Sequence, residues 1–180
     1  MLDTHDLIAR YPCLEVCRVE LDQAFDLLRR TFERDGKLLV CGNGGSAADA
    51  DHITGELLKG FHLPRPLSPR SRARLGEELA ANLQDALPAI PLTAFPAFST
   101  AFANDLDARY AFAQLVWALG RSGDALLAIS TSGRSANVLH AARVSRARGL
   151  GVVALTGDAG GPLAALADIW CASLLWPRDP

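Results

Sequence analysis

Residues 38–46 read LLVCGNGGS: four apolar residues run into a glycine-rich turn, and a helical pattern begins directly after the serine. An α/β protein builds an anion site in this way, because glycines let the backbone come close to a ligand and the first N–H groups of the next helix point at it. The stretch therefore predicts a buried strand over 37–41, a phosphate-binding turn over 42–46 and a helix over 46–61.

The same order of features returns later in the chain. An apolar strand predicted over 124–129 is followed by the polar turn STSGRS at 130–135 and by a helical pattern over 136–148. The turn carries four hydroxyl side chains, at Ser130, Thr131, Ser132 and Ser135. Hydroxyls and N–H groups at a helix start bind phosphate without needing a lysine. Because ligands bind outside the carboxyl ends of parallel strands, we expect the two turns to lie at the same edge of one sheet.

Strands and helices alternate along the whole chain. The patterns predict strands over 37–41, 89–93, 124–129, 151–155 and 169–175. They predict helices over 13–35, 46–61, 71–84, 97–120 with a break near 104–105, 136–148 and 162–166. This alternation is typical of a parallel sheet with helices on both faces. We therefore expect one α/β domain, a three-layer α-β-α sandwich, with an N-terminal packing helix and a loop-and-helix insertion over about 62–90.

The bulk composition excludes several classes of protein. With a formal net charge of −2, the chain has no excess of positive charge that would attract nucleic acid or anionic lipid. No apolar run approaches the roughly 20 residues that a membrane helix needs. The N-terminal residues lack the apolar core of a signal peptide, and the four cysteines form no CxxC pair. We expect a cytoplasmic protein with reduced thiols and with neither a nucleic-acid nor a membrane partner.

Two groups of charged residues each allow two interpretations. His52 and Glu56 are four residues apart, which places both side chains on one face of the second helix. Beside a phosphate cradle they indicate chemistry on a small phosphorylated molecule, but the same spacing is typical of a surface ion pair. Four arginines follow, at Arg65, Arg70, Arg72 and Arg74. They form either a solvated face or a contact with a second phosphate or a partner subunit.

Four segments taken together resemble the sugar isomerase (SIS) domain and, within it, the phosphoheptose isomerases. They are CGNGGSAADADHITGEL at 41–57, AFANDLD at 101–107, LLAISTSGRSANVLHAA at 126–142 and VVALTGDAGGPLAALADI at 152–169. The resemblance covers roughly residues 15–175. It implies a five-stranded parallel sheet of the Rossmann-like or flavodoxin-like kind, and a homotetramer with active sites at subunit contacts. It also implies conversion of sedoheptulose 7-phosphate to glycero-manno-heptose 7-phosphate, in the biosynthesis of nucleotide-activated heptose.

The resemblance carries the family's functional residues onto matching positions of this chain. The implied sugar- and phosphate-contacting residues are Asn43, Gly44, Gly45, Ser46, Asn104, Asp105, Ser130, Thr131, Ser132 and Ser135. His52 and Glu56 match two members of the family's zinc site, and Glu56 also matches its catalytic glutamate. An aldose–ketose isomerase needs a base over the carbon, and a carboxylate partly desolvated in a cleft has a suitably raised pKa. A bound zinc ion would orient the sugar or polarise its carbonyl.

The sequence departs from the family after the last predicted strand. The family usually continues into a helix whose glutamine and histidine complete the zinc site, and that histidine is the expected acid–base partner. Here no histidine follows His140, and the sequence gives no reason to favour His62 as a substitute. Two explanations stay open: the natural protein has the helix and this sequence lacks it, or a short form has a weakened or repurposed site.

The second explanation leads to a different function. Close relatives of these isomerases bind replication-initiator proteins or sense sugar phosphates inside regulators, so a non-catalytic SIS module that binds a sugar phosphate or an initiator protein is the alternative. The retained His52 and Glu56 favour an enzyme, because a binding module has no need of them. Prolines and arginines between 59 and 91, a stretch longer than in the shortest family members, suggest a lid or a subunit contact.

Overall fold

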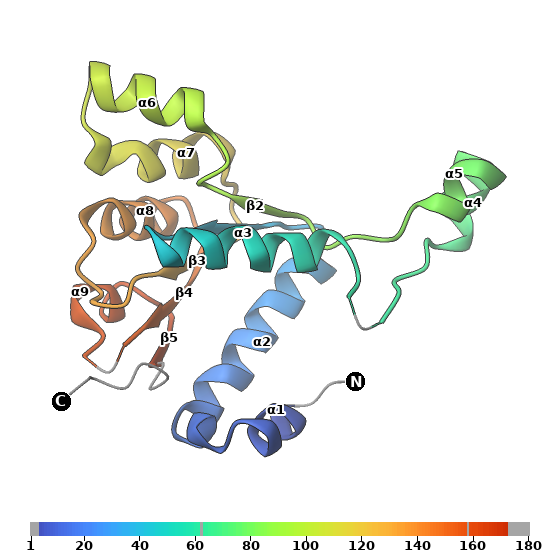
Figure 1. The fold of residues 1–180 in the computed structure, drawn as a ribbon, viewed down its shortest axis with the longest axis horizontal. Helices are drawn as coiled ribbons and strands as arrows, with labels where there is room; N and C mark the ends of the chain where they lie inside the picture. The colour runs from blue at the N-terminus through green and yellow to red at the C-terminus, as the bar shows by residue number, and fades with distance from the viewer. Residues whose placement is uncertain (1–3, 62, 158, 173–180) are drawn as a thin grey trace.

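The structure, a computed structural model, describes residues 4–61, 63–157 and 159–172 (Figure 1). The first half contains α1 (Thr4–Arg10), the 3-10 helix η1 (Pro12–Cys17), α2 (Arg18–Glu33), β1 (Leu38–Cys41), α3 (Gly45–Leu58), α4 (Pro69–Leu75), α5 (Glu77–Asn82) and β2 (Ala89–Pro91). The second half contains α6 (Pro96–Asp105), the 3-10 helix η2 (Ala108–Tyr110), α7 (Ala111–Leu119), β3 (Ala125–Ile129), α8 (Ala136–Ala147), β4 (Gly151–Thr156), α9 (Gly161–Ala164) and β5 (Ile169–Ala172).

The described strands form one parallel sheet in the order β2-β1-β3-β4-β5. This is the flavodoxin-like order that the resemblance implies. The chain adds β2 on one side of β1 and β3 on the other, so the topological switch point of the sheet lies between β1 and β3. Cys41, the last residue of β1, is paired with Ala128, one residue before the end of β3. The turns that follow β1 and β3 therefore start side by side.

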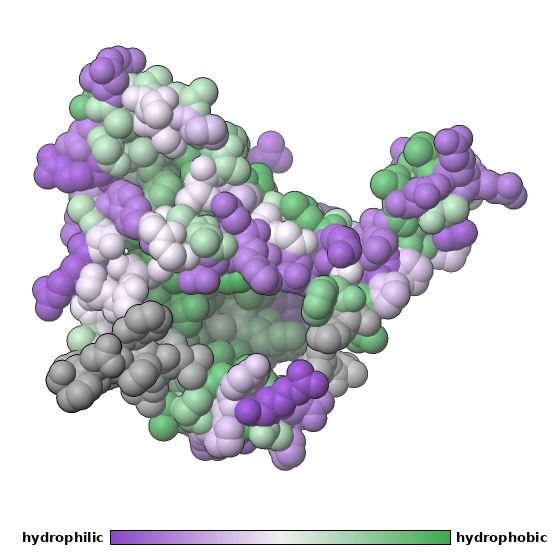
Figure 2. Space-filling view, viewed as in Figure 1, coloured by the Kyte–Doolittle hydropathy of each residue, from purple (hydrophilic) through white to green (hydrophobic). Residues whose placement is uncertain are grey.

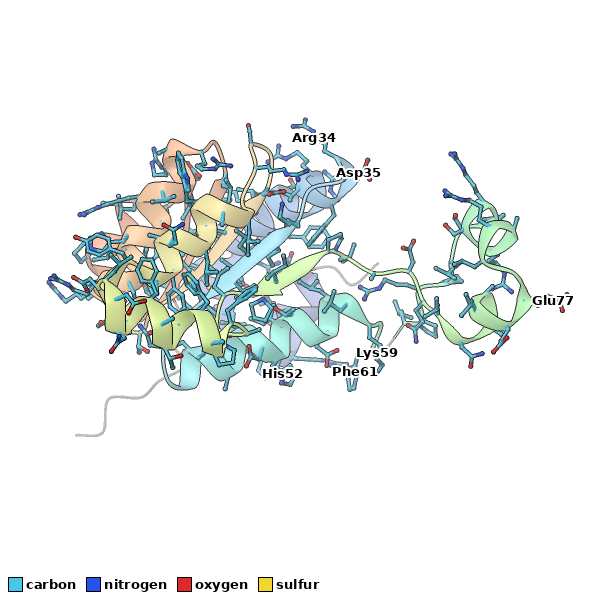
Figure 3. The ribbon with its side chains drawn as sticks, turned by 90° about the horizontal axis from the view of Figure 1, so that it is seen from above. Arg34, Asp35, His52, Lys59, Phe61 and Glu77 are labelled. Atoms are coloured by element: carbon cyan, nitrogen blue, oxygen red, sulfur yellow. The ribbon has the colours of Figure 1, made fainter. Side chains whose placement is uncertain are left out.

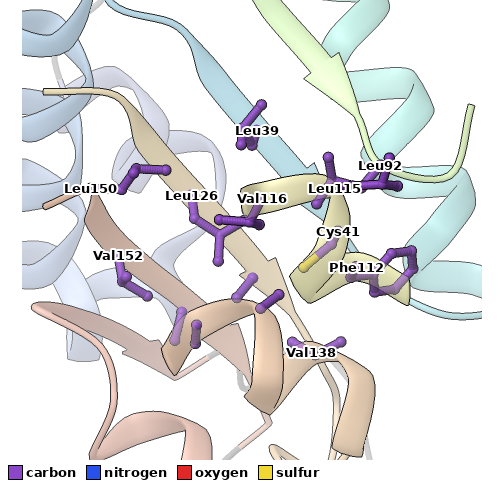
Figure 4. Packing of buried hydrophobic residues seen from close by; sticks show 14 of the residues in the cluster. Leu39, Cys41, Leu92, Phe112, Leu115, Val116, Leu126, Val138, Leu150 and Val152 are labelled. Atoms are coloured by element: carbon purple, nitrogen blue, oxygen red, sulfur yellow. The ribbon is translucent and has the colours of Figure 1, made fainter. Parts of the chain in front are cut away.

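Helices cover both faces of the sheet, which confirms the three-layer sandwich. Every residue of β1 is fully buried, and successive side chains point to opposite faces. Leu39 and Cys41 pack against α7, α8 and α9 (Figure 4). Leu38 and Val40 pack on the other face, where α2 and α3 lie. The apolar run that predicted a strand buried on both sides is thus the centre of the molecule.

A buried carboxylate joins the beginnings of the two central strands. Asp124, which is 5% exposed, accepts hydrogen bonds from the backbone N–H of Lys37 (2.9 Å) and from that of Arg121 (2.8 Å). The Lys37 ammonium donates to Oδ2 of Asp124 at 2.5 Å. The residues before β1 and before β3 are therefore fixed to one another at the amino end of the sheet.

Some predicted boundaries were wrong. The helix predicted over 71–84 is two short helices, because Gly76 adopts a φ of 79° that ends α4. The predicted helix over 13–35 starts as a 3-10 turn, and α3 ends at Leu58 rather than at 61. β5 ends at Ala172, and residues 173–175 of its predicted span lie outside the described residues. Among the described helices, none has the length and apolarity that crossing a bilayer requires.

The insertion between α3 and β2 projects from the body. The arm, defined here as residues 65–85, carries α4 and α5 at its far end, and Figure 1 shows both helices standing apart from the sheet and its covering layers. The two helices pack against each other.

The four cysteines differ sharply in accessibility. Cys13 is exposed, whereas Cys17, Cys41 and Cys171 are buried. Burial raises the pKa of the Cys41 thiol to about 12 and that of the Cys171 thiol to about 11. Since the thiolate is the reactive form, these two thiols are chemically silent near neutral pH.

Replacing Asp124 by alanine removes the acceptor for three donors, two of them on Lys37. We expect the free energy of unfolding to fall by about 3 kcal/mol, the scale for losing one partner of a buried, hydrogen-bonded pair. Urea denaturation followed by circular dichroism measures it. The control Asp26→Ala removes an exposed carboxylate that pairs with Arg29 and should cost far less. Equal losses in the two variants would contradict the structural role of Asp124.

Thiol labelling tests the burial pattern. At pH 8 the folded chain should react rapidly with a disulfide reagent at one thiol per chain, and Cys13→Ser should remove that fast phase. All four thiols should react in denaturant. A fast phase that persists in Cys13→Ser would show that one of the buried thiols is accessible.

Candidate functional site

The two polar turns meet at the switch point between β1 and β3, as the sequence predicted. They enclose a pocket of about 160 Å³. Its lining residues are Asn43, Ser46, Ile129, Ser130, Thr131, Ser132 and Ser135. The starts of α3 and α8 flank it, so backbone N–H groups of two helices are available to a ligand in the same small space.

Glycines shape the first turn. Gly44 has a φ of 56° and a ψ of −121°, a conformation that favours glycine. A Cβ on Gly42 would lie 2.6 Å from the carbonyl oxygen of Ser46, so only glycine lets the chain turn this tightly into α3. The Ser46 N–H then donates to the Asn43 carbonyl at 3.0 Å. The shape of the turn therefore requires glycine at positions 42 and 44.

A third glycine-rich turn supports the second one. Gly133 has a φ of 62°, and a Cβ there would lie 1.9 Å from the carbonyl oxygen of Gly160. The Leu163 N–H donates to the Gly133 carbonyl at 3.1 Å, and the Gly157 N–H donates to the Thr131 carbonyl at 2.9 Å. Gly157 and Leu163 thus hold the backbone of the 130–135 turn from behind.

Two asparagines join the first two turns. The Asn43 Nδ2 donates to Asn137 Oδ1 at 2.9 Å, and the Asn137 Nδ2 donates to Asn43 Oδ1 at 2.8 Å. Asn137 Oδ1 also accepts from the Val138 N–H at 3.0 Å, which ties the pair to the first turn of α8. Sequence reasoning missed Asn137. The signal was present, since asparagine is a poor helix former that favours positions where its amide bonds locally.

The hydroxyls of the second turn are held at different depths. Ser130 is buried and donates to Ser135 Oγ at 3.1 Å, while Thr131 and Ser132 are exposed. The Arg134 N–H donates to Ser132 Oγ at 3.3 Å. Every side chain lining the pocket is uncharged. Such a set of hydroxyl, amide and backbone donors suits a phosphate group, which accepts many hydrogen bonds at once.

His52 and Glu56 lie on α3 but outside the pocket. Their closest approach is 3.7 Å between Nε2 and Oε1, and their side chains are 76% and 43% exposed. The ten residues from Ser46 to Glu56 correspond to about 15 Å along the helix. Figure 3 shows His52 on the outer side of α3, away from the sheet. In the single chain Glu56 is partly exposed beside His52, so a place for it in a closed cleft stays a prediction.

The other predicted contact residues also stand apart from the pocket lining. Asn104 and Asp105 end α6, are exposed, and form a side-chain hydrogen bond of 2.8 Å with each other. Gly44 and Gly45 are exposed at the start of α3 and contribute through the shape of the turn. Their roles in substrate binding stay predictions.

The described residues do not make a zinc site on their own. Within residues 4–61, 63–157 and 159–172, no three histidine, cysteine or acidic side chains cluster as metal ligands. His52 and Glu56 supply two donors, whereas zinc is bound by three or four. His140 stacks on Tyr110 with ring centroids 4.4 Å apart, and His62 lies outside the described residues. The zinc expected from the resemblance therefore does not fit this donor set.

Relatives of known name cover most of the chain. The profile of the SIS domain matches residues 14–157. The phosphoheptose isomerase of Aromatoleum aromaticum is 41% identical over 155 residues, which are 86% of this chain and 69% of that protein. The phosphoheptose isomerase of Thiobacillus denitrificans is 44% identical over 144 residues, 80% of this chain and 64% of that protein.

Solved structures give the same result. A phosphoheptose isomerase from Francisella tularensis superposes with a TM-score of 0.72 at 31% identity, over 100% of this chain and 88% of that one. The enzyme from Neisseria gonorrhoeae superposes with a TM-score of 0.70 at 37% identity, over 89% of this chain and 75% of that one. The chain therefore belongs to the SIS domain family and, within it, to the phosphoheptose isomerases.

Proposed function

We propose that the chain is a phosphosugar isomerase that converts D-sedoheptulose 7-phosphate to D-glycero-D-manno-heptose 7-phosphate, in the biosynthesis of nucleotide-activated heptose. The observation that carries the proposal is the pocket between β1 and β3, where two polar turns and two helix starts face one small space. Relatives that match most of the chain are named phosphoheptose isomerases, which supports the reaction.

In this mechanism the pocket holds the phosphate, and α3 positions the chemistry. Donors from both turns bind the phosphate oxygens, and this remote binding energy orients the other end of the sugar. The reaction moves a proton between C1 and C2 through a cis-enediol, so a base must take the proton from one carbon and return it to the other. Glu56, which lies on the helix that begins at the pocket, is the proposed base.

The exposure of Glu56 is the reason to propose an oligomer. Closing the site over Glu56 would keep the enediol from solvent. We therefore propose a cytoplasmic homo-oligomer, a tetramer, in which a subunit contact covers this part of α3. No step is assigned to zinc, because the described residues supply only two of its donors.

One observation favours a second candidate. The cradle is formed within the single chain, whereas His52 and Glu56 lie in solvent outside it. A non-catalytic SIS module that binds a sugar phosphate needs the phosphate cradle but has no need of His52 and Glu56. Turnover separates the two candidates, because a binding module would hold sedoheptulose 7-phosphate without isomerising it.

The first test is turnover of sedoheptulose 7-phosphate by the chain and by Glu56→Gln. We expect kcat to fall by about a hundredfold or more in the variant, the scale of general-base catalysis. Sugar-phosphate binding, measured by isothermal titration calorimetry, should stay nearly unchanged because the phosphate cradle is intact. The control is Glu33→Gln, an exposed glutamate on α2, which should retain full activity. Full turnover in Glu56→Gln would exclude Glu56 as the base.

The asparagine pair is tested by Asn43→Ala, Asn137→Ala and the double variant. Each single change frees one turn from the other, so we expect weaker sugar-phosphate binding, with a loss of about 1 kcal/mol. Because the two amides bond to each other, the double variant should lose little more than either single one. Calorimetry measures the three affinities, with the exposed Gln114→Ala as the control. Additive losses would show that the asparagines act separately.

A further inference from the structure

The arm is fixed firmly to the body at its root. The Arg65 guanidinium donates to the carbonyls of Glu56 and Leu57 at the end of α3, at 3.2 and 2.5 Å. The Asp85 N–H donates back to the Arg65 carbonyl at 2.8 Å, so the two ends of the arm meet. The Gly60 N–H donates to Gln84 Oε1 at 3.2 Å beside them. The arm therefore leaves the body in a defined direction.

The two helices at the far end of the arm are short and leave apolar side chains uncovered. α4 and α5 have seven and six residues, and helices this short are unstable in water without packing. Three leucines on them are only partly covered, at 38% to 49% exposure: Leu75, Leu79 and Leu83. Figure 2 shows the arm as a separate lobe on which apolar and charged surface lie side by side. Such a surface marks an interaction site.

The charges on α4 are opposite to those on α3, whereas α5 on the same arm carries two glutamates, Glu77 and Glu78. α4 carries three arginines and no acidic residue, and Arg70 and Arg74 are exposed at helical spacing on one face. α3 carries two aspartates and a glutamate and no lysine or arginine. Asp49 and Glu56 are exposed along its length, whereas Asp51 accepts a hydrogen bond from Thr93. The acidic outer side of α3 is therefore complementary in charge to the basic α4.

The geometry lets the arm reach this surface on a second copy of the chain. In both perpendicular views, Figures 1 and 3, the arm extends beyond the C-terminal end of α3 and away from its own body. A twofold axis near the root turns the arm of one copy back along α3 of the other, and the same contact forms twice.

We propose that the arm is a self-association element: the arm of one copy docks on the acidic outer side of α3 of a second copy. Arg70 and Arg74 meet Asp49 on α3, which is not part of the proposed catalytic machinery, and the exposed leucines are covered in the contact. This goes beyond the proposed function, because it names the surfaces that assemble the oligomer and requires no substrate.

Sedimentation velocity of the full chain without sugar phosphate tests the proposal. The chain should form dimers or larger assemblies. In a shortened chain, residues 66–83 are replaced by Gly-Gly, so that the two glycines and Gln84 form a three-residue turn between Arg65 and Asp85, whose backbones are hydrogen-bonded to each other. It should keep the circular dichroism of the sheet and its covering helices and lose at least about tenfold in association constant. A monomeric full chain, or a shortened chain that associates as strongly, would overturn the proposal.

A charge exchange identifies the docking surface. Arg70→Glu/Arg74→Glu and Asp49→Lys should each associate at least about tenfold more weakly than the unmodified chain, because each places like charges in the contact. An equal mixture of the two should recover affinity, since in the mixed pair both contacts join opposite charges. The control Arg30→Glu/Arg34→Glu, two exposed arginines with the same spacing on and just after α2, should associate normally.

Two results would refute docking of the arm on α3. One is an arm variant that associates normally, and the other is a mixture that stays dissociated. Both readings are independent of catalysis, because the association is measured without substrate. An absence of turnover would refute the proposed function and leave this result unchanged.

Discussion

The pairing of β1 with β3 is the constraint on which the site depends. These two strands lie at the centre of the sheet, and the chain leaves their carboxyl ends towards opposite faces, into α3 on one side and α8 on the other. Their last residues are neighbours, so the turns that follow cannot separate without breaking the most deeply buried part of the molecule. Asp124 holds the opposite ends of the same strands. The phosphate cradle is therefore positioned by the core, and its loops need little rigidity of their own.

The uncharged lining of the cradle is consistent with an isomerase. Substrate and product of such a reaction carry the same phosphate, so the binding energy of that group is equal for both and cannot by itself accelerate the chemistry. A lysine in the pocket would strengthen both complexes and slow the release of product. Hydroxyls such as those of Ser130 and Ser135, together with helix-start N–H groups, give directional but weaker binding. In the proposed function, such binding would orient the sugar and still allow the product to leave.

Local patterns predicted the sheet and the two turns well. The apolar run 38–41 and the glycines after it are constrained by their nearest neighbours in sequence, and short-range rules capture such features. The reciprocal amide pair of Asn43 and Asn137 joins residues 94 positions apart; a local pattern marks Asn137 as an unusual helix residue but cannot identify its partner. The exposure of Glu56 was also missed, because the spacing of His52 and Glu56 shows which side chains share a face and not what covers that face.

The meeting of Arg65 and Asp85 has a consequence for how this fold can change over evolutionary time. The two residues are bonded through their backbones, so everything between them is an excursion that begins and ends at the same point on the surface. Lengthening such an excursion costs only a slowly growing closure entropy, about 0.6 kcal/mol for each doubling of its length. A longer arm leaves the structure of the sheet, the switch point and the pocket unchanged. The length and sequence of the arm can therefore change during evolution, and with them the surfaces that the molecule offers to partners, without a change in the pocket between β1 and β3.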